Sequence, residues 1–481
     1  MEAKERGSKR ALRAGAAGAA PVNQSTFGSK AESPQQPLLE NVTKQEEEQK
    51  LIAVLKSDGP QFDKDVVCRR LAVIGTKEAV PALAALLADE KLCDIARYGL
   101  EPIPDPAVDE ALRAALGKLK GRQLVGVINS IGIRRDSKAV DDLVKRIGDA
   151  DAGVAAATAA ALGKIGGPEA TKALVQALTH DPAAVRPAVG DACVTIADAL
   201  LAEGKFGEAA AMFDRVRGAE LPKPILLAAT RGAILARQSD GAPLLVEQLK
   251  SGDWDVFDMA LRLVREMRGA DVTRAVAAQL SNLPPQKQIL LLQALGDRRD
   301  PVALPVVLEA AKSGEVKVRV AALQAVAPLW DVSVVPTLFE AALDSQAEVA
   351  ETARTSLAGI PNTDTKVNDA VVARLADKDP KVRRVAIEAV GKRRILAAVV
   401  PLVKAADDSD AQIRVAVLQA LTEIALAHRG EAAAKDEAKK AALALADKMA
   451  PSNPTEAAEA KKKLTEPLVK KGPVPMKSPG L

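Results

Sequence analysis

The stretch DPKVRRVAIEAV at residues 379–390 decides the fold, and EVKVRVAALQAV at residues 315–326 repeats its pattern. Each stretch begins with an acidic residue, Asp379 or Glu315, whose side chain can accept hydrogen bonds from the free N–H groups of a helix start. Apolar residues then recur at intervals of three and four, which is the spacing of one face of a helix. The two stretches therefore predict two equivalent amphipathic helices.

The same pattern recurs along the chain, mostly at intervals of 31 to 33 residues. Its first apolar position, here called the lead residue, is Val154, Val185, Val256, Val318, Val349, Val382 or Ile413. The residues three positions upstream, where a helix cap is expected, are mostly acidic: Asp151, Pro182, Asp253, Glu315, Gln346, Asp379 and Asp410. Glycines at 163, 296, 359 and 391 are expected to end several of these helices, and a second amphipathic run follows. Two helices per repeat predict a stack of helical hairpins.

These stretches resemble the second helix of HEAT repeats. The segment CDIARYGLEPIPDPAVDEALRAALGKLKG at residues 93–121 also resembles bacterial HEAT-repeat proteins of unassigned function. The resemblance implies a right-handed superhelix of the armadillo type, with second helices along a concave face and non-catalytic binding as its activity. We therefore predict an all-α solenoid of roughly eleven hairpins without a β-sheet.

Three parts are expected along the chain: a tail at residues 1–45, the solenoid at 46–450 and a second tail at 451–481. Each tail carries a net charge of +3, from seven basic and four acidic residues in the first and six and three in the second. Their low-complexity composition predicts disorder. The interval from Val185 to Val256 is too long for two repeats, so residues 185–222 are interpreted as a longer unit, either a HEAT unit with longer helices or a tetratricopeptide-like one.

The composition predicts a core of small aliphatic side chains, because 48% of the residues are hydrophobic but only two are Trp, one Tyr and six Phe. Cys68, Cys93 and Cys193 are widely spaced and odd in number, which favours buried thiols in a reducing compartment. A cytoplasmic monomer is therefore expected, with an exported protein as the alternative, because the basic N-terminus lacks the apolar run of an export signal. No stretch reaches the roughly 18 apolar residues of a membrane span.

The sixth residue after each lead residue is expected to point away from the apolar stripe, toward the concave face. This column is polar and mostly uncharged, which favours a protein or peptide partner over nucleic acid. Its candidate members are Asp191, Arg262, Gln324, Thr355, Glu388 and Gln419, with Gln293 added by homologous register; Ala160 takes the first position. Trp254 and Trp330 are candidate partner anchors or core fillers. The alternative for the column is a solvated helix face.

Paired arginines recur near the ends of the same helices, at Arg134 and Arg135, Arg298 and Arg299, and Arg393 and Arg394. They are expected along one edge, where they could bind an anion such as nucleic acid together with the basic tails. The preferred interpretation is that they satisfy helix C-termini, where the dipole favours cations. A further arginine after the lead residue, at 186, 319, 383 and 414, is expected to pair with a turn aspartate.

No catalytic, cofactor or metal residue is predicted. The only histidines, His180 and His428, are far apart, and no phosphate-binding glycine motif is present. The sequence thus favours a protein-binding scaffold or adaptor, with nucleic-acid binding as the alternative and a HEAT-like lyase as a third possibility.

Overall fold

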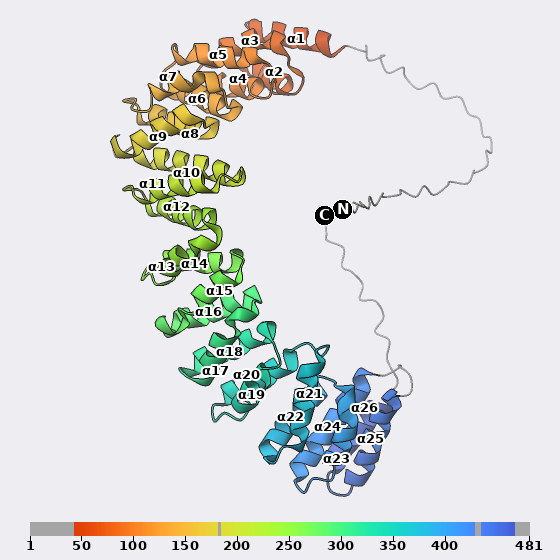
Figure 1. Ribbon diagram of the computed structural model, residues 1–481. Coiled ribbons are helices and arrows are strands. Elements are labelled where there is room, and N and C mark those ends of the chain that lie inside the picture. The colour runs from red at the N-terminus through yellow and green to blue at the C-terminus, as the bar shows by residue number, and fades with distance from the viewer. Residues whose placement is uncertain (1–42, 181–183, 429–433, 467–481) are drawn as a thin grey trace, which may run out of the picture.

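The computed structural model describes residues 43–180, 184–428 and 434–466, and every regular element there is helical. Consecutive α-helices pair into hairpins (Figure 1). The first helices of the hairpins are α1 (Lys44–Lys56), α3 (Val80–Ala85), α5 (Pro106–Leu116), α7 (Val140–Val144), α9 (Pro168–His180), α11 (Phe206–Arg217), α13 (Ala242–Leu249), α15 (Ala270–Ala277), α17 (Leu304–Lys312), α19 (Val334–Ala341), α21 (Thr365–Ala373), α23 (Val399–Ala405) and α25 (Ala434–Met449). The second helices are α2 (Gln61–Ile74), α4 (Cys93–Leu100), α6 (Gly121–Arg134), α8 (Ala152–Ile165), α10 (Arg186–Ala202), α12 (Lys223–Ala236), α14 (Trp254–Glu266), α16 (Pro285–Arg298), α18 (Val316–Val326), α20 (Ala347–Gly359), α22 (Pro380–Lys392), α24 (Ala411–Ala427) and α26 (Pro454–Thr465).

Short 3₁₀ helices lead into or extend many of these elements. They are η1 (Lys77–Ala79), η2 (Leu86–Ala88), η3 (Ser137–Ala139), η4 (Gln238–Gly241), η5 (Leu280–Asn282), η6 (Pro301–Ala303), η7 (Ala327–Leu329), η8 (Arg374–Ala376) and η9 (Leu396–Ala398). The 26 α-helices make thirteen hairpins, more than the roughly eleven expected from periodicity. The difference arises because some first helices are short, such as the five-residue α7, and because the stack continues past residue 450.

The aspartates ahead of the lead residues cap the second helices as predicted. Asp151 accepts hydrogen bonds from the N–H groups of Gly153 and Val154, and Asp253, Asp379 and Asp410 each accept one in the same way. Glu315 and Gln346 occupy the cap position without such a bond. Aspartate caps therefore fix the start of several second helices along the stack.

Glycines 163, 296 and 391 do not end their helices, contrary to expectation; they lie within α8, α16 and α22. Each packs against an alanine of the next second helix. A methyl group added at Gly391 would lie 2.7 Å from the Cα atom of Ala420, and one at Gly163 would lie 2.9 Å from that of Ala192. The glycines thus let neighbouring second helices approach closely, and only Gly359 stands at a helix end.

Second helices contact one another in sequence from α2 to α26, whereas contacts between consecutive first helices are sparser. Because one row is more closely packed, the stack bends toward it. Figure 1 shows the resulting open arc, with α1 to α8 at one end and α22 to α26 at the other. The second helices line the hollow side over much of this arc (Figure 1).

The buried core consists of two clusters that meet at α12. Ala229, Ala233 and Ala236 of this helix belong to the cluster that begins at Ile52, whereas Ile234 belongs to the cluster that ends at Leu464. Both are built mainly from Ala, Leu and Val, as the composition predicts. The core is therefore a long, thin strip along the stack.

The boundaries of the solenoid differ from those expected. Helix α26 occupies residues 454–465, so the expectation of a disordered tail at 451–481 is wrong for this segment. Residues 1–42 and 467–481, which hold most of both predicted tails, lie outside the described residues. In the long unit at 185–222, α10 has 17 residues, which accounts for part of the extra length. Its tetratricopeptide-like character stays a prediction. None of the described helices is long and apolar enough to cross a bilayer.

Candidate functional site

The predicted column lies on the exposed side of the second helices. Its members occupy α10, α14, α16, α18, α20, α22 and α24, and all are exposed except Glu388, which is half-buried. We call these seven residues the inner column. The second helices that hold these residues, from α14 to α24, each contact the next one, so the side chains follow one another across the surface.

The inner column extends further toward the N-terminus than the sequence analysis recognised. Tyr98 of α4 and Asn129 of α6 stand 31 residues apart and continue the same spacing through Ala160 to Asp191. Arg231 of α12 fills the gap between Asp191 and Arg262. Counting back by 31 from Ala160 would have found the first two. Counting back by 31 from Arg262 would likewise have found Arg231, whereas counting forward from Asp191 would not, because the long unit shifts the register.

Most charged members of the inner column already have a counter-ion. Arg262 pairs with Asp258 at 2.8 Å, and Glu388 pairs with Arg384 at 3.2 Å and with Arg354 at 3.8 Å. Among the described residues, by contrast, the side chains of Gln293, Gln324, Thr355 and Gln419 have no hydrogen-bond partner. The column thus offers free, neutral hydrogen-bonding groups, three of them on the consecutive second helices α16, α18 and α20.

The two tryptophans differ in exposure. Trp254 is about half-exposed, meets Phe257 edge-on at 5.7 Å between ring centroids, and has the Lys287 ammonium 5.2 Å from its ring centre. Trp330 is partly buried and packs against the C-terminal core cluster. Packing therefore explains Trp330, and Trp254 keeps a surface that a partner could contact.

The first arginine of each predicted pair is not available to an outside anion. The Arg134 guanidinium donates to the carbonyls of Glu101 and Ile103 at 2.8 and 2.7 Å and pairs with Asp109. Arg298 and Arg393 reach the end of the preceding second helix in the same way, and Arg393 donates to the carbonyls of Leu357 and Ile360 at 2.8 and 2.6 Å. Burial lowers the pKa of both Arg298 and Arg393. The alternative of an anion-binding edge is therefore wrong for these three residues; they bind carbonyls at the ends of helices, as the preferred interpretation expected, and tie consecutive repeats together.

The second arginine of each pair has a different position. Arg135, Arg299 and Arg394 have φ angles of 55°, 53° and 58°, the left-handed conformation that follows a helix end. All three side chains are exposed. Of the six arginines expected along the edge, these three remain exposed, and two of them, Arg299 and Arg394, lie 95 residues apart in the sequence.

Two of the four arginines that follow the lead residues pair with a turn aspartate as predicted, whereas Arg186 pairs with Glu220 at 3.3 Å. Arg319 pairs with Asp344, and Arg383 pairs with Asp408 at 2.7 Å. Arg414 donates to the carbonyls of Asp408 and Ser409. Hydrogen bonds from Arg319 and from the N–H of Asp410, respectively, hold the pKa values of Asp344 and Asp408 below the usual range of aspartate. Arg319 and Arg383 thus join consecutive repeats, and Arg414 holds the turn before its own helix.

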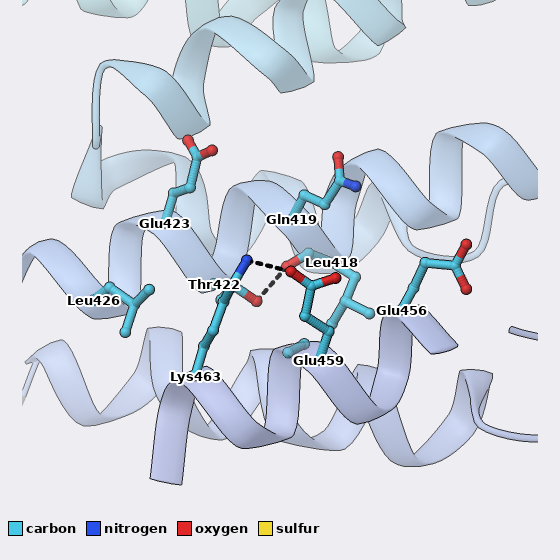
Figure 2. A pocket seen from close by; sticks show the side chains of 9 residues that line it. Leu418, Gln419, Thr422, Glu423, Leu426, Glu456, Glu459 and Lys463 are labelled. Carbon is cyan, nitrogen blue, oxygen red and sulfur yellow. Dashed lines mark hydrogen bonds and ion pairs between the residues drawn. The ribbon is translucent and has the colours of Figure 1, made fainter. Parts of the chain in front are cut away.

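A hollow of about 190 Å³ lies between α24 and α26 (Figure 2). Leu418, Thr422, Leu426 and Ala460 are among the residues that line it. Gln419 of the inner column stands on its rim with three glutamates and Lys463, which pairs with Glu459 at 2.6 Å. A neighbouring hollow shares Glu423 and Leu426 and adds Lys392 and Arg394. Both signs of charge therefore meet at this end of the inner column.

The predicted buried thiols are confirmed: Cys68, Cys93 and Cys193 are all buried and free. Burial raises the pKa of Cys68 to about 11 and that of Cys193 to about 12, so both are protonated and poor nucleophiles at neutral pH. Within the described ranges, no three His, Cys, Asp or Glu side chains gather as a metal site would require.

Comparison with known proteins relates this stack of helical hairpins to HEAT repeats. The family model of HEAT repeats matches residues 104–192, from the approach to α5 into α10. Residues 104–192 thus match the HEAT-repeat model, and the described chain has the fold of a HEAT-type α-solenoid, as the sequence predicts. No curated protein matches the chain.

Solved structures of karyopherins share this fold. Karyopherin Kap121p, bound to the extreme C-terminus of the protein phosphatase Cdc14p, is 12% identical with a TM-score of 0.51, covering 89% of this chain and 55% of its own. Yeast importin-beta (Kap95p) is 16% identical with a TM-score of 0.42, covering 88% of this chain and 67% of its own. A Kap95:Nup1 complex is 15% identical with a TM-score of 0.45, covering 87% and 66%. The chain thus spans between about half and two thirds of the length of these structures.

Proposed function

We propose that this chain is a non-catalytic scaffold that binds a protein or peptide segment along its inner column. The observation that carries the proposal is the set of exposed, unpartnered side chains of Gln293, Gln324, Thr355 and Gln419. Carboxamides and hydroxyls can donate and accept hydrogen bonds, so they suit the alternating N–H and C=O groups of a peptide backbone. A row of them on contacting helices can follow an extended segment.

Nucleic-acid binding has less support. A phosphate backbone requires several cations on one surface, and the first arginine of each pair is already bound to carbonyls of its neighbouring repeat. The fold shared with Kap121p adds that a stack of this kind can hold a peptide, because that structure contains a bound C-terminal segment.

The test is peptide selection with the full chain. A displayed library of peptides of about 18 residues is selected on the immobilised protein, and enriched peptides are titrated by fluorescence anisotropy. The variant Q293A/Q324A/T355A/Q419A should bind them at least ~10-fold more weakly, as expected when several interfacial hydrogen bonds are lost. The control E247A/E309A/D369A/K404A changes exposed residues on first helices and should bind normally. Equal binding by both variants would refute the proposal.

A further inference from the structure

The second helix of the first hairpin, α2, exposes a row of mainly apolar side chains, whereas the inner column is polar. On α2, residues Phe62, Val66, Arg69 and Val73 are spaced by four, three and four positions, so they form one stripe along the helix. This stripe lies opposite the buried side of α2, which holds Val67, Cys68 and Leu71. The three apolar members are 74%, 48% and 75% exposed.

Tyr98 of the neighbouring helix α4 extends this stripe. Its side chain is 53% exposed, and α2 and α4 are in contact. We call Phe62, Val66, Val73 and Tyr98 the apolar patch. Exposed apolar side chains gathered in this way mark binding surfaces more often than single ones do.

The charges around the apolar patch already neutralise one another. Arg69 pairs with Asp65 at 2.8 Å, and Arg70 pairs with Glu47 at 2.7 Å. Asp94, one turn before Tyr98 on α4, is held by Arg97 at 2.6 Å and also by Arg122 of α6, and Glu101, 3.9 Å from Arg97, balances the second arginine. The patch therefore presents no net charge to a partner, so electrostatic complementarity favours an uncharged, apolar surface.

We propose that the apolar patch binds the apolar face of an amphipathic helix from the partner protein. The spacing of the stripe is that of a helix–helix seam, in which side chains of one helix fit between those of another at every third and fourth position. Phe62 and Tyr98 supply the aromatic surface on which interface binding energy concentrates. The inference rests on the proposed function, because it assigns one end of the same inner surface to a particular class of partner segment.

The test uses the same peptide selection on the full chain. A second class of enriched peptides, distinct from those that bind the inner column, should carry apolar residues at positions i, i+3 or i+4, and i+7. The variant F62S/V73S should weaken their binding at least ~10-fold, as loss of interface anchors does. The control V400S/V403S removes two similarly exposed valines of α23 and should leave binding unchanged. Because the contact is apolar, the affinity should change less than about twofold between low and high salt.

Three results would overturn the inference. If F62S/V73S binds the peptides normally and Q293A/Q324A/T355A/Q419A loses binding, the helix site is ruled out and the proposed function stands. Sedimentation showing that the wild-type chain self-associates and F62S/V73S does not would assign the patch to a second copy of the chain. Selection that enriches no peptide would remove both proposals. Thermal melts followed by circular dichroism are the check that each variant is folded.

Discussion

Replacing Gly391 with alanine tests whether close approach of the second helices holds the stack together. The new methyl group would lie 2.7 Å from the Cα atom and 2.9 Å from the Cβ atom of Ala420 on the next second helix. Backbone atoms cannot rotate away, so α22 and α24 must separate. Such overpacking costs about 1–3 kcal/mol, whereas alanine gains about 0.5–1 kcal/mol over glycine within a helix.

Gly359→Ala is the matched control, because Gly359 is the last residue of α20 and an added methyl group meets no atom within 4 Å. Gly359→Ala should gain much of the stabilisation that alanine gives a helix over glycine, without a steric clash with a neighbouring helix. Gly391→Ala should therefore be less stable than this control by about 1–3 kcal/mol. The stability of Gly296→Ala, whose added methyl group would have its nearest contact at 3.3 Å, should lie between those of the two other variants.

Urea unfolding followed by tryptophan fluorescence suits the comparison. Trp330 packs against the C-terminal core cluster, Trp254 contacts Phe257 of the same cluster, and α16, α20 and α22 contribute to it. Changes in the unfolding midpoint at constant slope then report changes in stability. The reasoning is refuted if Gly391→Ala unfolds at the same urea concentration as Gly359→Ala.

Two further predictions concern the ties between repeats. Arg393→Ala should destabilise the chain by roughly 2–4 kcal/mol, because it leaves buried carbonyls of Leu357 and Ile360 unpaired. Arg394→Ala should change stability by less than about 0.5 kcal/mol, since its side chain is exposed; equal losses in urea unfolding would contradict the assignment. Asp344 and Asp408 have lowered pKa values in the folded chain, so their contribution is present above the ordinary aspartate pKa of about 3.9 and is lost as the pH falls through the folded value. The urea midpoint of the wild type should therefore fall more steeply between about pH 5 and pH 3 than that of D344N/D408N, and parallel curves would disprove this linkage.

The sequence by itself determined the repeat. Aspartates such as Asp379 mark helix starts through contacts with residues two or three positions ahead, and the spacing of apolar residues shows which side of each helix is buried. Because both signals are local, they located the hairpins and placed Gln293, Gln324 and Thr355 on the exposed side. The same register also predicted that Arg383 pairs within the stack.

The tertiary structure decided how neighbouring repeats meet. Arg134 and Arg135 are adjacent in sequence, but one binds carbonyls of the preceding repeat and the other remains exposed. Gly391 resembles a helix stop in sequence, yet its lack of a side chain serves the approach of Ala420. Contacts between residues about 30 positions apart depend on the distance and angle between helices, which no local pattern encodes. For the same reason, only the assembled stack brings α4, which holds Tyr98, against α2 and so forms the apolar patch.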